Sequence, residues 1–364
     1  MKRFCITLWQ KDTTKLVLIG VAFIFLTLLT AVYANRQIVD LRFEGDAQPL
    51  GTNSIALLPT ITRYDTNHYY TIVEHGYDAI EVAFFPLYPL VVNAARSVGL
   101  ATVYALPLVS WLFTIASIIV IFHWARYELR AVKSRLSPYW VIGLFLIFPT
   151  SLYLTIGYSE SLFIFLTSLS LFAFRKNSYV VAGVAAALAS ATRVQGVALV
   201  VFFLLEYLTS RHRRHMALLP VAMSAIGIGS YMSYLWVTFG NPLAFIAAQR
   251  HWGRFDSSFV GNLVSSAEPL HLWYGSVLAV MLYAVYRYLG RAWLGYALVF
   301  ISLPIASGRF DSLNRYMLAA PILFIALGLW LNAKSELVHL LYIVSSAFLL
   351  AWSIVFYFNG YWVG

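Results

Sequence analysis

A cluster of ionisable side chains lies in the segment RYDTNHYYTIVEHGYDAIEVAFFPLYP, residues 63–89. Seven ionisable residues fall within nineteen positions, although only 11% of the chain is charged: Arg63, Asp65, His68, Glu74, His75, Asp78 and Glu81. A carboxylate can take a proton from a hydroxyl group that is held within hydrogen-bonding reach. We therefore predict Asp65 as a general base, with Arg63 and His68 as neighbouring substrate-binding residues. The alternative is that Asp65 is a solvated helix cap.

Further polar residues interrupt apolar segments along the rest of the chain. An arginine at membrane depth needs an anion or carbonyl groups around it, and arginine binds phosphate oxygens through paired hydrogen bonds. Each position also has a structural interpretation: Glu160 as an interfacial cap, Arg315 in a surface ion pair, or Trp252 as an interfacial anchor. The candidate substrate-binding residues are Tyr158, Ser159, Glu160, Arg193, Gln195, Gln249, Arg250, Trp252, Arg309, Arg315 and Tyr316.

Composition places these residues in a membrane protein. The 364-residue chain is 61% hydrophobic and has a mean hydropathy of +0.75, whereas soluble domains contain about 45–50% apolar residues. Apolar runs recur along the whole length, so we expect one transmembrane domain, residues 1–364, without a separate soluble domain. Cys5 is the single cysteine, which excludes an intramolecular disulfide framework and a multi-cysteine metal site.

The apolar segments predict an all-α, polytopic fold with about eleven transmembrane segments. A break at Arg193–Gln195 divides the stretch 178–208 into two halves, each too short to span a bilayer alone, which we interpret as a re-entrant pair of short helices. The other predicted segments are 16–34, 103–124, 139–157, 159–174, 216–237, 271–289, 292–307, 314–332 and 337–358.

The basic residues set the predicted orientation. All six lysines and most arginine clusters fall on one side of the predicted topology, which the positive-inside rule assigns to the cytoplasm together with the N-terminus. The C-terminus and two loops, 35–102 and 238–270, then lie on the outer face. The basic excess is explained by this orientation and by anionic membrane lipids, so we predict no nucleic-acid partner.

The first outer loop contains a predicted amphipathic helix at 62–76. Asp65 opens this helix, where the helix dipole favours a negative charge, and Gly76 suits its C-terminal end. The predicted outer face therefore combines one carboxylate-bearing helix with several arginines. This combination suits a reaction whose leaving group is a phosphate attached to a lipid.

The order of the motifs resembles a known family. The blocks RYDTNHYYTIVEHGY, AFFPLYPL, FPTSLYLTIGYSESLF, SATRVQG, FGNPLAFIAAQRHWGR and RYMLAAP span residues 60–321. They resemble the bacterial relatives of the phosphatidylinositol-glycan class V mannosyltransferases (GPI mannosyltransferase II), membrane glycosyltransferases of the GT-C type. The family usually has tryptophan where this chain has Tyr64.

The resemblance implies an inverting glycosyltransferase in the bacterial plasma membrane, with its active site on the outer face. Its donor would be a polyprenyl-phosphate-linked sugar, mannose by the family's example, and its acceptor a hydroxyl group of a lipid or glycan. No cofactor and no obligatory metal are implied. Asp65 corresponds to the catalytic base, Arg193 and Arg315 to a clamp for the lipid phosphate with Arg309 in reserve, and Glu160 to a residue that orients a substrate.

Other classes of protein fit some of the same features. A flippase or transporter for lipid-linked sugars also needs an amphiphilic cavity and intramembrane arginines, but the charged residues of this chain are concentrated on one face. A non-catalytic assembly subunit and a transferase of a different sugar are further alternatives.

Overall fold

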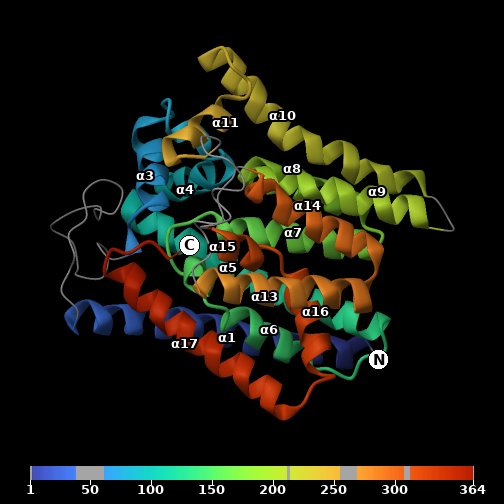
Figure 1. Ribbon diagram of the computed structural model, residues 1–364. Helices are drawn as coiled ribbons and strands as arrows, with labels where there is room; N and C mark the ends of the chain where they lie inside the picture. Colours follow the sequence, from blue (N-terminus) through green and yellow to red (C-terminus); the bar gives the residue numbers. More distant parts are fainter. Residues whose placement is uncertain (1, 38–60, 211–213, 255–268, 307–311, 364) are drawn as a thin grey trace.

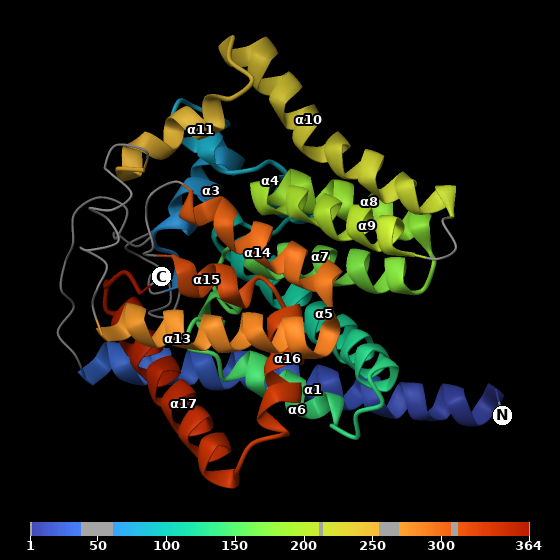
Figure 2. The ribbon, with the colours of Figure 1, turned by 45° about the vertical axis from the view of Figure 1, so that its right-hand side comes forward.

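The computed structural model describes residues 2–37, 61–210, 214–254, 269–306 and 312–363. All regular secondary structure in these ranges is helical, which confirms the predicted all-α fold. The helices run roughly side by side, and in two views the marks for the N- and C-termini lie toward opposite ends of the bundle (Figures 1 and 2).

Four stretches within the described residues are long and apolar enough to cross a membrane: Lys11–Ala34, Thr102–Ala131, His215–Phe239 and Glu336–Phe358. Together with shorter apolar helices they make this chain an integral membrane protein. The number of crossings and the orientation of the termini remain predictions. The main helices of the bundle are α1 (Lys2–Gln37), α5 (Thr102–Ala131), α6 (Pro138–Leu146), α7 (Glu160–Arg175), α8 (Tyr179–Thr192), α9 (Leu199–Thr209), α10 (Leu219–Phe239), α13 (Pro269–Ala284), α14 (Arg291–Ile305), α15 (Leu313–Leu318), α16 (Ile322–Leu331) and α17 (Glu336–Phe358).

The bundle is built by successive contacts between neighbouring helices. Helix α7 packs against both α5 and α8, α8 packs against α10, and α1 lies against α5 and α17 (Figure 1). Small residues allow the closest of these approaches, as is common between membrane helices. A Cβ atom added at Gly227 of α10 would lie 1.9 Å from the carbonyl oxygen of Ala187 in α8. Only glycine fits at that crossing.

The stretch 178–208 forms the predicted pair of short helices. Helix α8 has 14 residues, about 21 Å at the α-helical rise per residue, which is shorter than the roughly 30 Å hydrocarbon core of a bilayer. Arg193 at its C-terminal end is extended (φ −156°, ψ 147°), and a 3₁₀ turn at Val194–Ala198 reverses the chain into α9. Residues at both outer ends of the pair, Asn177 and Ser210, line the same hollow. The break at Arg193 is confirmed; the re-entrant path through the bilayer remains a prediction.

Two predicted spans are not continuous helices, because proline interrupts them. The predicted span 139–157 is helical only as far as Leu146 of α6, and the chain continues into a 3₁₀ turn at Ser151–Leu154. The predicted span 314–332 is divided between α15 and α16. Pro149 and Pro321 lie at these breaks, and proline lacks the N–H group and the space that a continuing helix requires.

The segments of the two predicted outer loops form a small helical layer at one end of the bundle (Figure 1). It contains α3 (Asp65–His75), α4 (Leu87–Ser97) and a 3₁₀ turn at Glu81–Ala83. Helix α11 (Ala244–Ala248) of the other predicted loop packs against that turn. The predicted amphipathic helix is therefore confirmed as α3, which ends at Gly76 with φ 87°.

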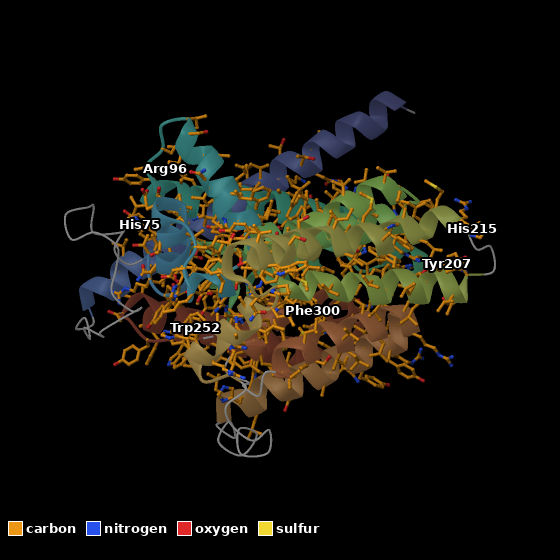
Figure 3. The ribbon with its side chains drawn as sticks, turned by 90° about the horizontal axis from the view of Figure 1, so that it is seen from above. His75, Arg96, Tyr207, His215, Trp252 and Phe300 are labelled. Carbon is orange, nitrogen blue, oxygen red and sulfur yellow. The ribbon has the colours of Figure 1, made fainter. Side chains whose placement is uncertain are left out.

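The two ends of the molecule carry different predicted loops. Seen from above, the labelled His75, Arg96 and Trp252 lie toward one end, whereas Tyr207 and His215 lie toward the other (Figure 3). The first three belong to the predicted outer loops. The arrangement therefore separates the residues of the proposed chemistry from the basic segment around residue 214.

Candidate active site

Asp65 is held at the first turn of α3 by contacts with the segment before α7. Its backbone N–H donates to the Tyr158 hydroxyl at 3.3 Å, and the Thr66 hydroxyl donates to the Gly157 carbonyl at 3.3 Å. A Cβ atom at Gly157 would lie 2.9 Å from the side chains of both Leu106 and Thr66. The glycine lets the start of α3 lie directly against this segment.

The Asp65 carboxylate belongs to an ion network with Glu160, Arg193 and Arg315. The Arg315 Nη2 atom lies 2.8 Å from Asp65 Oδ2. Arg315 also donates to Glu160 Oε1, from Nε at 3.0 Å and from Nη2 at 2.5 Å. Arg193 Nη1 lies 2.8 Å from the same Glu160 oxygen. One carboxylate oxygen thus links both guanidinium groups, and one of these groups holds the predicted base.

Four separate elements supply the ion network. Asp65 and Glu160 lie in the first turns of α3 and α7, where the helix dipole favours negative charge, and Arg193 follows the last turn of α8, where it favours positive charge. Arg315 comes from the short helix α15. The local placements of Asp65, Glu160 and Arg193 are therefore favourable before the four side chains meet.

Burial divides the ion network into an inner and an outer part. The side chains of Glu160 and Arg315 are 1% and 5% exposed, whereas those of Arg193 and Asp65 are 16% and 24% exposed. Buried charges are tolerated when they are paired and hydrogen-bonded, and the two carboxylates balance the two guanidinium groups. The inner pair therefore supports the network, while Asp65 and Arg193 can be reached by a substrate.

Aromatic rings surround Arg315. Its guanidinium carbon lies 4.6 Å from the ring centre of Tyr153, 5.0 Å from that of Tyr158 and 5.1 Å from that of Trp362. Such cation–π contacts stabilise a desolvated guanidinium group. These rings restrict Arg315 to the orientation in which it bridges Glu160 and Asp65.

A second cluster joins the two predicted outer loops. The His68 ring stacks on Phe84 with centroids 4.7 Å apart and meets the edge of Trp252 at 5.5 Å. His68 Nδ1 lies 3.2 Å from Glu81 Oε1. Burial raises the pKa of Glu81, while a hydrogen bond with Glu81 lowers the pKa of neighbouring Asp78. Because His68 lies three residues after Asp65 in α3, this cluster adjoins the helix face that carries Asp65.

Tyr69 connects the two clusters. Its ring contacts Phe84 edge-on with centroids 5.2 Å apart, and its hydroxyl donates to Ser159 Oγ at 2.7 Å. Arg193 Nη1 donates to the same oxygen at 3.4 Å. The aromatic cluster and the ion network therefore form one continuous wall.

The structure brings together most of the residues that the sequence singled out. Asp65, Glu160, Arg193 and Arg315 are in direct contact, and Tyr158 and Ser159 contact members of this group. Arg63 is buried, and its carbonyl oxygen accepts from the Tyr357 hydroxyl at 3.3 Å. Arg309 lies outside the described residues. The other predicted positions are Gln195 and Tyr316, which are buried, Gln249, which is half-buried, and Arg250, which is exposed.

Several residues of the site escaped the sequence analysis. Tyr153, Glu81 and the segment 357–363 all contact predicted site residues. Tyrosine and tryptophan near the end of a span are typical of the membrane interface, so their types give no specific signal. Glu81 lies in the polar segment from which Asp65 was chosen, and only the fold shows that it pairs with His68.

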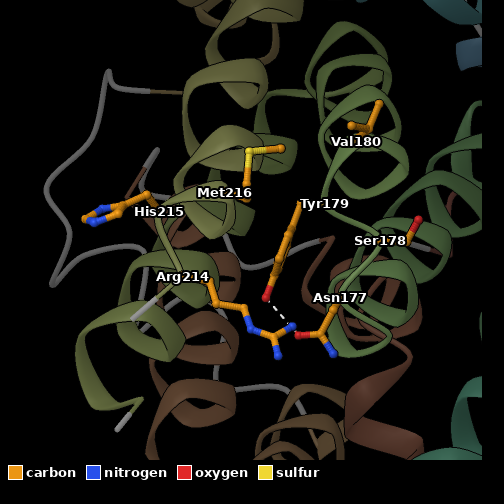
Figure 4. A pocket seen from close by; sticks show the side chains of 7 residues that line it. All are labelled: Asn177, Ser178, Tyr179, Val180, Arg214, His215 and Met216. Atoms are coloured by element: carbon orange, nitrogen blue, oxygen red, sulfur yellow. Dashed lines mark hydrogen bonds between the residues drawn. The ribbon is translucent and has the colours of Figure 1, made fainter. Parts of the chain in front are cut away.

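A separate hollow lies at the opposite end of α8. It encloses about 650 Å³ and is lined by Asn177, Ser178, Tyr179, Val180, Arg214, His215 and Met216. In Figure 4 the Tyr179 hydroxyl donates to Asn177 Oδ1, at a distance of 2.8 Å, and the Arg214 guanidinium group points toward this pair. None of the lining residues belongs to the ion network. Among the described residues, no group of three or more His, Cys, Asp or Glu side chains could hold a metal ion.

Sequence comparisons give one partial match. No protein-family model matches the sequence. GPI alpha-1,6-mannosyltransferase 2 of Cricetulus griseus is 28% identical over 159 residues, a match covering 41% of this chain and 32% of that protein. The match thus spans about a third of the length of this curated relative.

Among solved structures, ArnT from Cupriavidus metallidurans bound to undecaprenyl phosphate superposes with a TM-score of 0.52 at 15% identity, covering 93% of this chain and 76% of ArnT. The archaeal oligosaccharyltransferase AglB from Archaeoglobus fulgidus, in complex with an inhibitory peptide and a dolichol-phosphate, gives 0.47 at 14% identity, covering 93% and 55%. The superposition on ArnT shows that the chain shares the fold of that protein, in agreement with the GT-C fold predicted from its motifs. Membership of the class V mannosyltransferase family remains a prediction.

Proposed function

We propose that this chain is an inverting glycosyltransferase that transfers a sugar from a polyprenyl-phosphate donor to a hydroxyl group of a lipid or glycan acceptor. The proposed sugar is mannose. The observation that carries the proposal is the ion network, in which Asp65 shares Arg315 with Glu160 and Glu160 holds Arg193. The partial match to a mannosyltransferase and the fold shared with an undecaprenyl-phosphate-bound enzyme support it.

Asp65 is the proposed base. Its carboxylate accepts the proton of the acceptor hydroxyl as that oxygen attacks C1 of the sugar, on the face opposite the phosphate. The new C1–O bond forms while the bond from C1 to the phosphate oxygen breaks, and the departing lipid phosphate keeps the electron pair. The configuration at C1 is thereby inverted. Because 24% of the Asp65 side chain is exposed, an acceptor can reach it.

The arginines are the proposed phosphate-binding groups. Arg193 is the more accessible of the two and contacts the phosphate first, whereas Arg315 lies behind it and shares its charge between Asp65 and the leaving group. When phosphate oxygens approach Arg315, its hold on Asp65 weakens and the carboxylate becomes a stronger base. Donor binding thus prepares the base for proton transfer.

The cluster of His68, Phe84 and Trp252 is the proposed acceptor side of the site. It adjoins Asp65 along α3 and offers aromatic surface beside the His68–Glu81 pair. Aromatic faces and buried polar groups suit a substrate with both apolar and hydroxyl-bearing surfaces. Gln249 and Arg250 precede Trp252 in the same turn and are proposed to contact this substrate at its outer edge.

Purified protein incubated with radiolabelled polyprenyl-phosphate-mannose and a lipid extract tests the proposal. The wild type should form a labelled product, and Asp65→Asn should remain folded but form none. Glu74→Gln is the matched control, since Glu74 lies on the same helix but outside the ion network, where it pairs with Arg96 at 2.9 Å and accepts from the Thr102 hydroxyl. A flippase would give no transfer product, and near-normal turnover by Asp65→Asn would remove Asp65 from the mechanism.

A further inference from the structure

Tyr64, immediately before the proposed base, has a strained backbone. Its φ and ψ are 54° and −122°, a conformation that residues with a Cβ atom rarely adopt. Such strain persists only where surrounding contacts impose it. Because Tyr64 is joined directly to Asp65, whatever holds Tyr64 also sets the position of the carboxylate.

The segment 357–363 supplies these contacts, although it lies almost 300 positions away in the sequence. The Tyr64 hydroxyl donates to the Gly360 carbonyl at 2.6 Å. Burial raises the pKa of Tyr64 to about 12, so the hydroxyl keeps its proton at neutral pH. The Tyr64 ring meets Tyr357 at 5.6 Å and the edge of Trp362 at 5.1 Å, while the Tyr357 hydroxyl donates to the Arg63 carbonyl at 3.3 Å.

A turn after α17 presents this segment to the site. Helix α17 ends at Phe358, and Gly360 has φ 91°, a conformation suited to glycine. In both ribbon views the mark for the C-terminus lies beside α15 (Figures 1 and 2). There the Asn314 side chain donates to the Val363 carbonyl at 3.1 Å.

The same segment also contacts the cationic side of the ion network. Trp362 is 39% exposed, and its ring centre lies 5.1 Å from the guanidinium carbon of Arg315. Asn314, which binds Val363, also accepts from the backbone N–H of Arg315 through Oδ1 at 2.8 Å. The segment 357–363 is therefore fixed to the backbone before Asp65 and to the arginine that binds Asp65.

We propose that the segment 357–363 is part of the active site and that Trp362 is a positioning residue, which holds Tyr64 and Arg315 together so that Asp65 faces the acceptor hydroxyl. The inference rests on the proposed function for its kinetic test, and it assigns no contact between Trp362 and substrate. A misplacement of a reacting group by about 1 Å can cost roughly 100-fold in rate. Loss of the indole should therefore lower the turnover number more than the affinity for the donor.

The test compares Trp362→Ala with Trp362→Phe, which keeps an aromatic ring beside Tyr64 and Arg315. Trp236→Ala is the matched control, because Trp236 is 67% exposed on α10 and belongs to neither cluster. With polyprenyl-phosphate-mannose and a lipid extract, Trp362→Ala should lower kcat by about 100-fold with donor KM near wild type. Trp362→Phe should restore most of the turnover, and Trp236→Ala should match the wild type.

A second measurement does not depend on activity. In a Cys5→Ala background, Asp65→Cys is reacted with a charged methanethiosulfonate reagent, with and without Trp362→Ala. The inference predicts several-fold faster modification when the indole is absent, because the turn at Tyr64 is released. The inference would be overturned if Trp362→Ala changed neither the turnover number nor the rate at which the introduced cysteine is modified. It would also be overturned if Trp362→Phe lost as much turnover as Trp362→Ala and had a lower unfolding temperature than the wild type. Absence of transfer by the wild type overturns the proposed function alone, and the modification rates still decide the role of the segment.

Discussion

The ion network makes Glu160 the most informative carboxylate to neutralise. Glu160→Gln keeps the shape of the side chain but removes the charge that holds two guanidinium groups. Opposite charges about 4 Å apart attract by about 4 kcal/mol at an effective dielectric constant near 20, and like charges about 5 Å apart repel by about 3 kcal/mol. The contacting nitrogens of Arg193 and Arg315 are at most 5.3 Å apart, the sum of their 2.8 and 2.5 Å distances to Glu160 Oε1.

The substitution therefore removes two attractions and leaves the repulsion, offset in part by the regained cost of burying the carboxylate. Breaking a buried ion pair typically costs about 3–5 kcal/mol, which for a protein of this size lowers the unfolding temperature by roughly 5 °C. Thermal unfolding in detergent measures this shift. Glu128→Gln is the matched control, because Glu128 is 2% exposed and accepts from Arg175 Nε at 2.9 Å, at the other end of α7. A similar loss of stability is expected there.

A prenyl phosphate distinguishes the two variants. If Arg193 and Arg315 bind a lipid phosphate, farnesyl phosphate should restabilise Glu160→Gln by about 2.7 kcal/mol at a concentration of 100 times its Kd, and more than it stabilises the wild type. It should stabilise Glu128→Gln only as much as it stabilises the wild type, because the ion network of that variant is intact. Two results would refute the reasoning: an unfolding temperature for Glu160→Gln equal to that of the wild type, or equal rescue of both variants by farnesyl phosphate.

Three other predictions concern separate parts of the molecule. Arg193→Lys keeps the positive charge but loses the planar guanidinium group that can make two parallel hydrogen bonds to a phosphate. The loss of one charge-assisted hydrogen bond should raise the donor KM about tenfold or more. A donor titration that gives an unchanged KM would exclude Arg193 from phosphate binding. Gly227→Ala places a methyl group against Ala187 and should lower stability by about 1–3 kcal/mol, whereas Gly229→Ala, whose Cβ would meet nothing within 4 Å, should not; equal unfolding temperatures would contradict this crossing. Because burial raises the pKa of Glu81 above its ordinary value of 4.5, its folded form prefers the proton and this carboxyl loses stabilisation as pH rises through the raised pKa. Glu81→Gln should therefore gain stability relative to the wild type between pH 4 and pH 8, and a pH-independent difference in unfolding temperature would count against a buried carboxyl at this position.

Much of the fold follows from local chemistry that the sequence displays. The apolar runs and the positions of the lysines indicate a helical membrane protein, and the break at Arg193 between two short apolar stretches indicates a helical pair. Asp65 and Gly76 mark the ends of α3 because helix termini have their own residue preferences. The helix breaks near Pro149 and Pro321 were missed because the spans were predicted from hydropathy, although the effect of proline on a helix is itself local.

The sequence also supplied the chemical types in the site: one accessible carboxylate, two arginines and a second carboxylate between apolar stretches. Their contacts join segments that are far apart in the sequence: 250 positions separate Asp65 from Arg315. No local pattern encodes which carboxylate binds which arginine, because that choice is made by the packing of α3, α7, α8 and α15. The role of the segment 357–363 is decided in the same way: its aromatic residues resemble an interfacial belt in the sequence, and only tertiary packing places Trp362 beside the proposed base and its arginine.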